Sequence, residues 1–116
     1  MSIKIYSCND SRGLRPMWTA EEMGVSYESE MMPFPPRFLH KEYMDVNILG
    51  TIPYLIDGDV EMTESVAMCQ YLVDLYGPTD LKVAIDEPDY HHYLNWLAHS
   101  DATLTFPQTV VLRYTF

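Results

Sequence analysis

Hydroxyl-bearing side chains stand at two positions where a helix is expected to begin. Ser11 precedes helical spacing over residues 12–23, and Thr63-Glu64-Ser65 precedes a second helical pattern over residues 64–76. Ser or Thr at such a position commonly caps a helix by accepting a backbone N–H. The start of a helix also attracts anions, because its first N–H groups have no partner within the helix. Taken alone, Thr63-Glu64-Ser65 is interpreted as a helix cap, and a small anionic ligand requires local cations and helix ends that outweigh the negative charge of the chain.

The remaining reactive side chains predict little chemistry. Cys8 and Cys69 lie far apart and belong to neither a CxxC motif nor a zinc-ligand spacing. We expect both thiols to be reduced. His91 and His92 are adjacent rather than four residues apart, so they do not form a helical metal-binding pair. The sequence thus predicts no metal site.

Composition limits the partners. The chain has 116 residues, which suits one domain, and 17 Asp and Glu against 7 Lys and Arg give a net charge of −10. Nucleic acid and anionic membrane surfaces both require clustered cations, so we expect neither as a partner. No apolar run approaches the roughly 20 residues that span a bilayer, and the N-terminal segment lacks a signal-peptide core. These features favour a cytoplasmic protein.

The expected elements alternate between strands and helices. The apolar spacing and the Gly and Pro residues predict strands at 3–6, 25–31, 54–56 and 60–62, and helices at 12–23, 38–46 and 64–76. Asp57-Gly58-Asp59 is a hairpin turn between the last two strands. Ser11 is the expected N-cap of the first helix, whose apolar face carries Leu14, Met17 and Trp18.

A different pattern begins after Gly77-Pro78. Residues 78–86 resemble a linker, and a long helix is expected from Glu87 to about Arg113, with a kink at Pro107. This helix is apolar on more than one side, which predicts neighbours on several sides.

Three stretches carry a family resemblance: KIYSCNDSRGLRPMWTAEEMGVSYE, NILGTIPYLIDGDVEMTESVAMCQYL and YLNWLAHSDATLTFPQTVVLRYTF. With the order of elements, they resemble the soluble glutathione transferase superfamily, in its bacterial-like, serine-type members. The resemblance implies an α/β, thioredoxin-like βαβαββα domain with a mixed four-stranded sheet over residues 1–77. A linker at 78–86 and the first helix of an incomplete all-α domain at 87–116 would follow. Length suggested one complete domain, and the resemblance amends that to a fragment.

The resemblance implies a binding site for glutathione. Ile52 would precede a cis Pro53, so that its backbone N–H and C=O pair with the peptide as a sheet edge would. Glu64 would contact the α-ammonium of the γ-glutamyl end, and Ser65 with the helix N-terminus its α-carboxylate.

For the glycyl end of glutathione, the sequence matches the pattern of the family less well. Thr51 stands where many members carry a basic or amide residue near the glycyl carboxylate. His40 or Lys41 could supply that cation, although both could equally be solvent-exposed.

Ser11 occupies the place of the catalytic hydroxyl of serine-type members, counting back from Arg15. Its hydrogen bond and the positive end of the helix would favour the glutathione thiolate, which attacks an electrophile. Arg12 is the nearest cation to this sulfur. A simple N-cap role for Ser11 remains the alternative.

Other assignments stay open. Tyr6 ends the first strand as in tyrosine-type members, and Cys8 begins a CxxS pattern that would suit a glutathione-dependent thiol–disulfide reductase. The chain could also be a non-catalytic binding or scaffold member, which the departure at Thr51 and the acidic surroundings favour.

The resemblance also implies partners. These are glutathione as co-substrate without a metal, a small hydrophobic electrophile, and a second copy in a homodimer formed by helices 64–76 and 87–113. A detoxification role follows by the same resemblance. Weak candidates for the electrophile pocket are Asp101, Thr105, Gln108 and Tyr114. We expect the last helix to be covered by a partner chain or poorly ordered.

Overall fold

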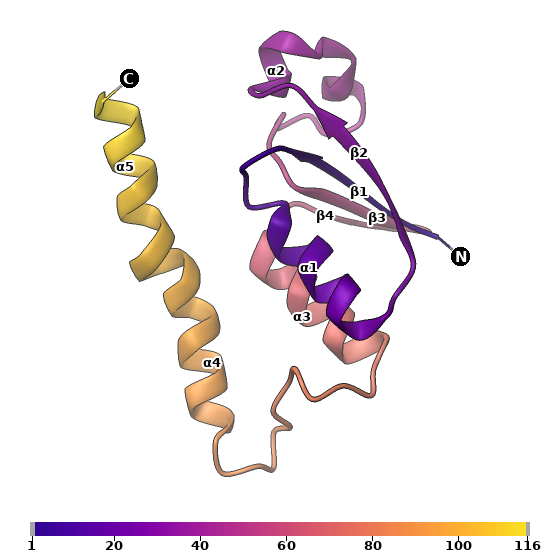
Figure 1. Ribbon diagram of the computed structural model, residues 1–116, viewed down its shortest axis with the longest axis vertical. Coiled ribbons are helices and arrows are strands. Elements are labelled where there is room, and N and C mark those ends of the chain that lie inside the picture. The colour runs from indigo at the N-terminus through magenta and orange to yellow at the C-terminus, as the bar shows by residue number, and fades with distance from the viewer. Residues whose placement is uncertain (1, 116) are drawn as a thin grey trace. The chain divides into compact units, whose positions relative to one another are not determined.

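The structure is a computed structural model in which residues 2–115 are described (Figure 1). The chain forms two compact units that divide after Pro78. Among the described residues, no helix has the length and apolarity that crossing a bilayer requires. Each unit is described by itself.

The first unit has the predicted βαβαββα order. Its elements are β1 (Ile3–Cys8), α1 (Leu14–Met23), β2 (Tyr27–Met32), α2 (Pro36–Leu39), the 3-10 helix η1 (Lys41–Asp45), β3 (Tyr54–Asp57), β4 (Val60–Met62) and α3 (Ser65–Leu75). The helix predicted over residues 38–46 is split into α2 and η1, and it starts earlier because Pro36 suits the first turn of a helix.

The four strands form one mixed sheet in the order β2-β1-β3-β4. β1 runs parallel to β2 and antiparallel to β3, with Cys8 opposite Met32 and Tyr6 opposite Tyr54. β3 and β4 form a hairpin through Gly58, which has a φ of 61°. The carboxyl ends of β1, β2 and β4 and the amino end of β3 therefore meet at one end of the sheet (Figure 1). This confirms the thioredoxin-like arrangement.

Strand β1 is longer than predicted. The loop expected from Ser7 onward begins after Cys8, because Ser7 and Cys8 continue the pairing with β2. Both side chains are small and fully or almost fully buried, at 0% and 2% exposure. Alternation of polar and apolar residues could not reveal this extension, since the strand is central in the sheet and covered on both faces.

The core lies on both faces of the sheet. One cluster joins the sheet to α1 and α3, which lie side by side in Figure 1: Ile3, Ile5, Ala20, Leu55, Met68 and Leu72. The other lies on the opposite face: Tyr6, Cys8, Met32, Tyr43 and Tyr54. Successive β1 side chains alternate between the two clusters, as a strand requires.

The predicted apolar face of helix α1 is correct for Met17, which packs against the core, and wrong for Leu14 and Trp18. Pro16 and Ala20 are its buried residues, whereas Leu14 and Trp18 are 59% and 60% exposed. Ala20 is fully buried in the cluster with Met68 and Leu72 of α3, and Met17 and Met23 of α1 pack at its edge.

A buried carboxylate links β3 to α3 at the far end of the sheet. Asp57 is 5% exposed, and its Oδ2 accepts hydrogen bonds from the hydroxyls of Tyr71 at 2.8 Å and Tyr76 at 2.6 Å. The bond to this carboxylate raises the pKa of Tyr76 to about 12. Asp57 therefore stabilises the packing of α3 on the sheet.

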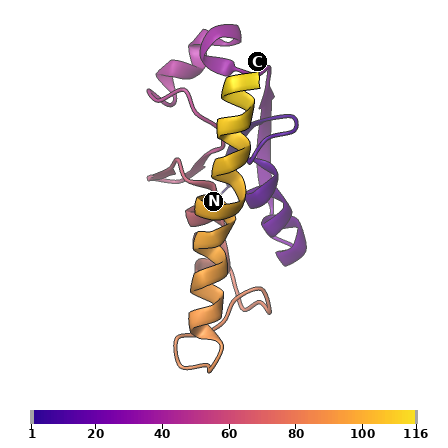
Figure 2. The ribbon, with the colours of Figure 1, turned by 90° about the vertical axis from the view of Figure 1, so that its left-hand side faces the viewer.

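The second unit is helical throughout its latter part. It contains α4 (Tyr90–His99), a π-helical turn η2 (Ser100–Thr105) and α5 (Phe106–Thr115), which follow one another as a single rod in Figure 2. The helix starts at Tyr90 rather than Glu87. The kink predicted at Pro107 is replaced by the π-helical turn η2, which precedes the proline. Proline lacks the N–H that would bond to the preceding turn, and the helical hydrogen bonding is irregular there.

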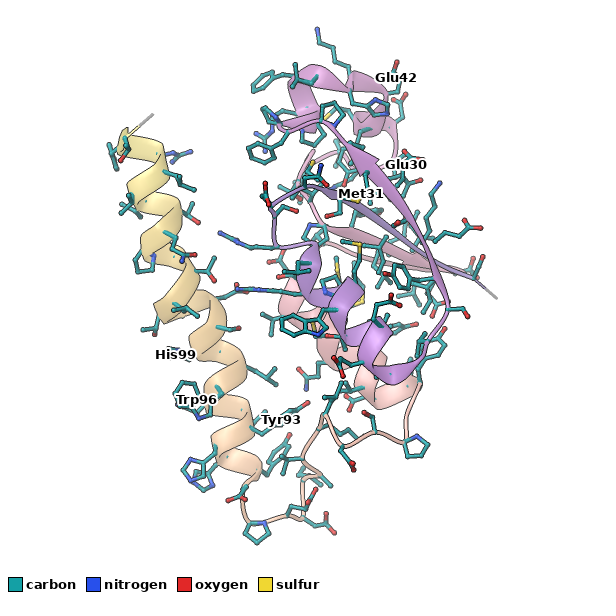
Figure 3. The ribbon with its side chains drawn as sticks, in the orientation of Figure 1. Glu30, Met31, Glu42, Tyr93, Trp96 and His99 are labelled. Atoms are coloured by element: carbon teal, nitrogen blue, oxygen red, sulfur yellow. The ribbon has the colours of Figure 1, made fainter. Side chains whose placement is uncertain are left out.

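The side chains of α4 and α5 are largely exposed. Neither helix contains a buried residue. Trp96 is 64% exposed and its ring lies 4.9 Å from that of His99 on the same helix (Figure 3). The apolar residues that predicted neighbours on several sides, such as Phe106 and Leu112, are 62% and 57% exposed.

Candidate functional site

The predicted site residues of the first unit gather at one end of the sheet. The loop after β1 carries Ser11, Ile52 lies just before β3, and Ser65 begins α3 directly after β4. A hydrogen bond of 3.1 Å from Arg15 Nη1 to Ser65 Oγ joins the first turns of α1 and α3. Segments that are 50 residues apart in the sequence are thereby brought together.

Ser11 organises the loop that leads into α1. Its hydroxyl donates to the carbonyl oxygen of Cys8 at 2.7 Å and accepts the N–H of Gly13 at 3.2 Å. The regular helix begins only at Leu14, with Gly13 rather than Ser11 at the N-cap position and no side-chain cap. The predicted N-cap is thus wrong by two residues, because a tight turn precedes the helix. Arg12 is exposed in that turn.

The start of α3 offers a helix N-terminus without a side-chain cap. Glu64 occupies the N-cap position with an extended backbone, and no side chain caps the helix. Ser65 is 5% exposed, and its hydroxyl is held by Arg15. Glu64 is exposed and its Oε2 accepts the hydroxyl of Thr63 at 2.9 Å. The capping role that an isolated Thr-Glu-Ser would favour is therefore absent here.

The segment before β3 is held by side chains of η1 and the following loop. The carbonyl oxygen of Thr51 accepts the Tyr43 hydroxyl at 2.5 Å and Asn47 Nδ2 at 2.9 Å. The Ile52–Pro53 peptide bond is cis. Among residues 2–115, the structure gives no hydrogen bond to the backbone N–H or C=O of Ile52. The predicted contact between the Ile52 backbone and a bound peptide stays a prediction.

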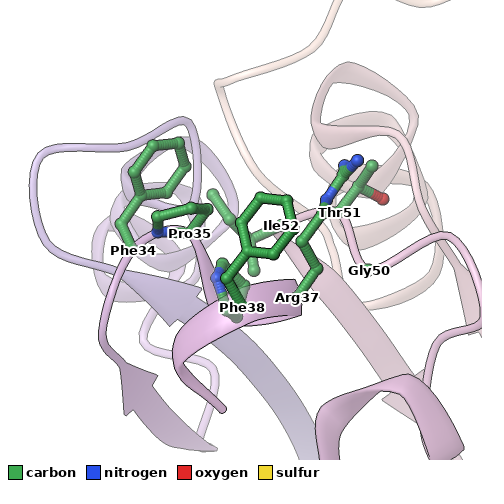
Figure 4. Close-up of a pocket in the computed structure, with 8 residues that line it drawn as sticks. Phe34, Pro35, Arg37, Phe38, Gly50, Thr51 and Ile52 are labelled. Carbon is green, nitrogen blue, oxygen red and sulfur yellow. The ribbon is translucent and has the colours of Figure 1, made fainter. Parts of the chain in front are cut away.

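A pocket of about 310 Å³ adjoins Ile52 (Figure 4). Its lining residues are Phe34, Pro35, Pro36, Arg37, Phe38, Gly50, Thr51 and Ile52. Gly50 has a φ of 65°, and a Cβ added to it would lie 3.1 Å from Cβ of Arg37 and 2.7 Å from Sδ of Met44. Close packing of α2 on this loop therefore depends on glycine.

Arg37 is a candidate site residue that was not predicted from the sequence. It lines the pocket, whereas His40 does not, and Nδ1 of His40 lies 3.8 Å from Oε2 of Glu42 instead. Because the second helix was predicted to begin at Phe38, Arg37 was expected to lie in the loop before it. The observed helix α2 begins at Pro36 and includes Arg37. The sequence did contain one relevant signal. Thr51 stands where many family members carry a basic or amide residue, so a cation from the preceding helix was needed instead.

A family model described as the glutathione S-transferase N-terminal domain matches residues 1–74. The chain belongs to the glutathione S-transferase superfamily. It is 29% identical to glutathione S-transferase 3 of Schizosaccharomyces pombe over 88% of this chain and 42% of that protein. It is 33% identical to glutathione S-transferase F10 of Arabidopsis thaliana over 75% of this chain and 42% of that protein. The chain thus spans less than half the length of these transferases.

Solved glutathione S-transferases have the same fold. The enzyme from Actinobacillus pleuropneumoniae superposes with a TM-score of 0.81 and 26% identity, covering 98% of this chain and 54% of that one. The enzyme from Methylococcus capsulatus superposes with a TM-score of 0.76 and 25% identity, covering 86% of this chain and 51% of that one. The likeness extends past residue 78 into the helical unit.

Within this glutathione S-transferase fold, the two rival candidates for the catalytic residue, Cys8 and Tyr6, are both buried. Cys8 is 2% exposed, with Sγ 3.8 Å from the carbonyl oxygen of Pro33, and burial raises the pKa of its thiol. A higher pKa leaves less of the reactive thiolate. Tyr6 is 8% exposed and its ring packs 5.6 Å from that of Tyr43. The buried environment of Cys8 therefore disfavours its thiolate, and the assignment of Tyr6 as the catalytic residue stays a prediction.

The four weak electrophile-pocket candidates all lie in the second unit. Asp101 and Thr105 belong to η2, and Gln108 and Tyr114 to α5. Thr105 is buried and its hydroxyl donates to the carbonyl of Ser100, while Tyr114 is 84% exposed. Their role toward an electrophile stays a prediction. No group of three metal-ligating side chains occurs in the part of the chain that the structure describes.

Proposed function

We propose that this chain is the glutathione-binding part of a serine-type transferase of bacterial-like character, in which Ser11 stabilises the glutathione thiolate for attack on an electrophile. The observation that carries the proposal is the meeting of three segments at one end of the sheet: the Ser11 loop, the Ile52 backbone and the α3 N-terminus. They offer a hydroxyl for a thiolate, a strand-like edge for a peptide, and N–H groups for a carboxylate.

The γ-glutamyl end of glutathione would contact the start of α3. Its α-carboxylate would accept hydrogen bonds from the first N–H groups of the helix and from the Ser65 hydroxyl. Arg15, bonded to Ser65, adds a positive charge beside this carboxylate. Glu64 is exposed and suits the α-ammonium. The charge of Arg15 opposes the net charge of −10 at the point where the carboxylate would bind.

The glycyl end would enter the pocket beside Ile52. An extended peptide paired with the Ile52 backbone and bound to Ser65 at one end runs past Thr51 and Gly50 at the other. The Arg37 guanidinium lines that pocket and suits the glycyl carboxylate. Arg37 thus supplies the cation that Thr51 lacks, and His40, beside Glu42, is the weaker candidate.

The chemistry needs the thiol to be ionised. A cysteine thiol has a pKa of about 8.5, so a modest decrease makes it mostly thiolate at neutral pH. A hydrogen bond from Ser11, the N-terminal end of α1 and the charge of Arg12 all favour the anion. The proton leaves to solvent, and the sulfur attacks a small hydrophobic electrophile. Asp101, Thr105, Gln108 and Tyr114 remain the proposed contacts of that electrophile.

Assembly and role follow by analogy with the superfamily. We propose a homodimer with α3 and the helices of the second unit at the contact, acting in the cytoplasm in detoxification. The exposed apolar side chains of α4 and α5 support a covering partner for that unit.

A non-catalytic binding role is the second candidate. It is favoured by one observation: the Ser11 hydroxyl donates its proton to the Cys8 carbonyl rather than outward. A reductase using Cys8 is less well supported, because that thiol is buried and its pKa is raised.

Calorimetric titration with glutathione tests the proposal. The chain and its Ser11→Ala variant should bind glutathione with similar affinity, whereas Ser11→Ala should lose at least tenfold in conjugation rate. Ser65→Ala should weaken binding itself. Absence of glutathione binding to the unaltered chain would refute both candidates; binding with no conjugation would leave the non-catalytic one.

A further inference from the structure

A buried hydroxyl lies directly behind Ser11. Ser7, the fifth residue of β1, is 0% exposed, and its Oγ lies 3.2 Å from Ser11 Oγ and 3.3 Å from the carbonyl oxygen of Cys8. Gly13 closes over it, since a Cβ added to Gly13 would be 1.6 Å from Ser7 Oγ. The space for this hydroxyl thus exists only because residue 13 has no side chain.

The two serines and one carbonyl form a closed hydrogen-bonding set. A serine hydroxyl has one proton to donate and two lone pairs that accept. Ser11 donates to Cys8 at 2.7 Å and accepts the N–H of Gly13 at 3.2 Å, so its second lone pair is left for the Ser7 hydroxyl. Ser7 has two acceptors within reach, Ser11 Oγ and the Cys8 carbonyl oxygen.

Stabilising a thiolate requires the single proton of Ser11 to turn away from Cys8. That rotation removes the 2.7 Å hydrogen bond from the Cys8 carbonyl. Ser7 can then turn its own proton to the same carbonyl, from 3.3 Å, without moving its oxygen. The new hydrogen bond from Ser7 offsets the one that the Cys8 carbonyl loses from Ser11. The hydrogen bond that Ser11 gains is to a thiolate anion and is therefore stronger than the one it gives up.

We propose that Ser7 is a positioning residue that frees the Ser11 proton for the glutathione sulfur by replacing Ser11 at the Cys8 carbonyl. The inference rests on the proposed function, because it needs glutathione bound beside Ser11. Each serine keeps its own proton throughout, and the proton lost by the thiol goes to solvent.

The test is the pKa of the glutathione thiol bound to the full chain, followed through thiolate absorbance across a pH titration at saturating glutathione. Ser7→Ala removes the hydroxyl and keeps Cβ. It should raise the pKa of the bound thiol by about half to one pH unit. The glutathione affinity, measured by calorimetry, should change less than twofold. Tyr71→Phe is the matched control, since it deletes a hydroxyl bonded to Asp57 at the far end of the sheet and should leave the pKa of the bound thiol unchanged.

A double-mutant cycle separates this role from a purely structural one. In the Ser11→Ala background, Ser7→Ala should cause no further shift in the pKa of the bound thiol, because Ser7 acts through Ser11. An equal shift in both backgrounds, or none in either, would overturn the inference while leaving the proposed function intact. Failure of the unaltered chain to bind glutathione would overturn both.

Discussion

The contact between Gly13 and Ser7 predicts an unusual sign for a helix substitution. Gly13 lies at the N-cap position of α1 with φ −60° and ψ −21°, a conformation that any residue adopts. The smaller backbone entropy of the unfolded chain alone would therefore make Gly13→Ala stabilising by about 0.4–1 kcal/mol. The added Cβ, however, would lie 1.6 Å from Oγ and 2.5 Å from Cβ of Ser7.

Because of this clash, Gly13→Ala should destabilise the protein rather than stabilise it. Real Cβ atoms do not approach other heavy atoms so closely, and Ser7 has no room to retreat because it is 0% exposed on the central strand β1. Overpacking a buried site typically costs about 1–3 kcal/mol. Because both Ser7 Oγ and Cβ are involved, we expect the upper part of this range. Gly13→Ala should thus lower the free energy of unfolding by about 2–3 kcal/mol.

Urea unfolding of the single and double variants measures this. Ser7→Gly removes both atoms that the new Cβ would meet, so Gly13→Ala should be neutral or stabilising in a Ser7→Gly background. The coupling between the two sites should then be about 2 kcal/mol or more, within the range known for residues in contact. An increase in stability for Gly13→Ala alone, or the same decrease in both backgrounds, would show that the close approach does not exist.

Two further predictions concern the ends of the sheet. Tyr76→Phe should lower the free energy of unfolding by about 1.5–3 kcal/mol, as expected for a hydrogen bond to a carboxylate, with the melting temperature as readout. The pKa of Tyr76 rises from 10.0 to about 12 on folding, so its stabilising contribution is complete below pH 10 and lost as the pH rises toward 12. Tyr76→Phe should flatten that alkaline decrease, and an identical decrease in both proteins would contradict the assignment. At the other end, Arg37→Met should raise the Kd for glutathione about tenfold, whereas His40→Gln should leave it unchanged in calorimetry; the reverse result would place the glycyl carboxylate nearer His40.

Local signals were sufficient for the order of elements. The Gly58 turn, the prolines at 33, 35 and 36 and the spacing of apolar residues predict the βαβαββα order because they act on the backbone within a few residues. Ile52-Pro53 and Thr63-Glu64-Ser65 could be singled out for the same reason, since each motif is contiguous in the chain. These features lie where the sequence led us to expect them relative to the strands.

Contacts between distant segments were decided only by the tertiary structure. Nothing in the sequence near Arg15 indicates that it bonds to Ser65 fifty positions later, and nothing near Ser7 indicates that Gly13 covers it. Burial also departed from local patterns: α1 buries Pro16 and Ala20, whereas Leu14 and Trp18 of the predicted apolar face are exposed. Spacing along the chain determined which residues can reach this end of the sheet. Packing in three dimensions determined that Arg37 lines the pocket and that Ser7 lies behind Ser11.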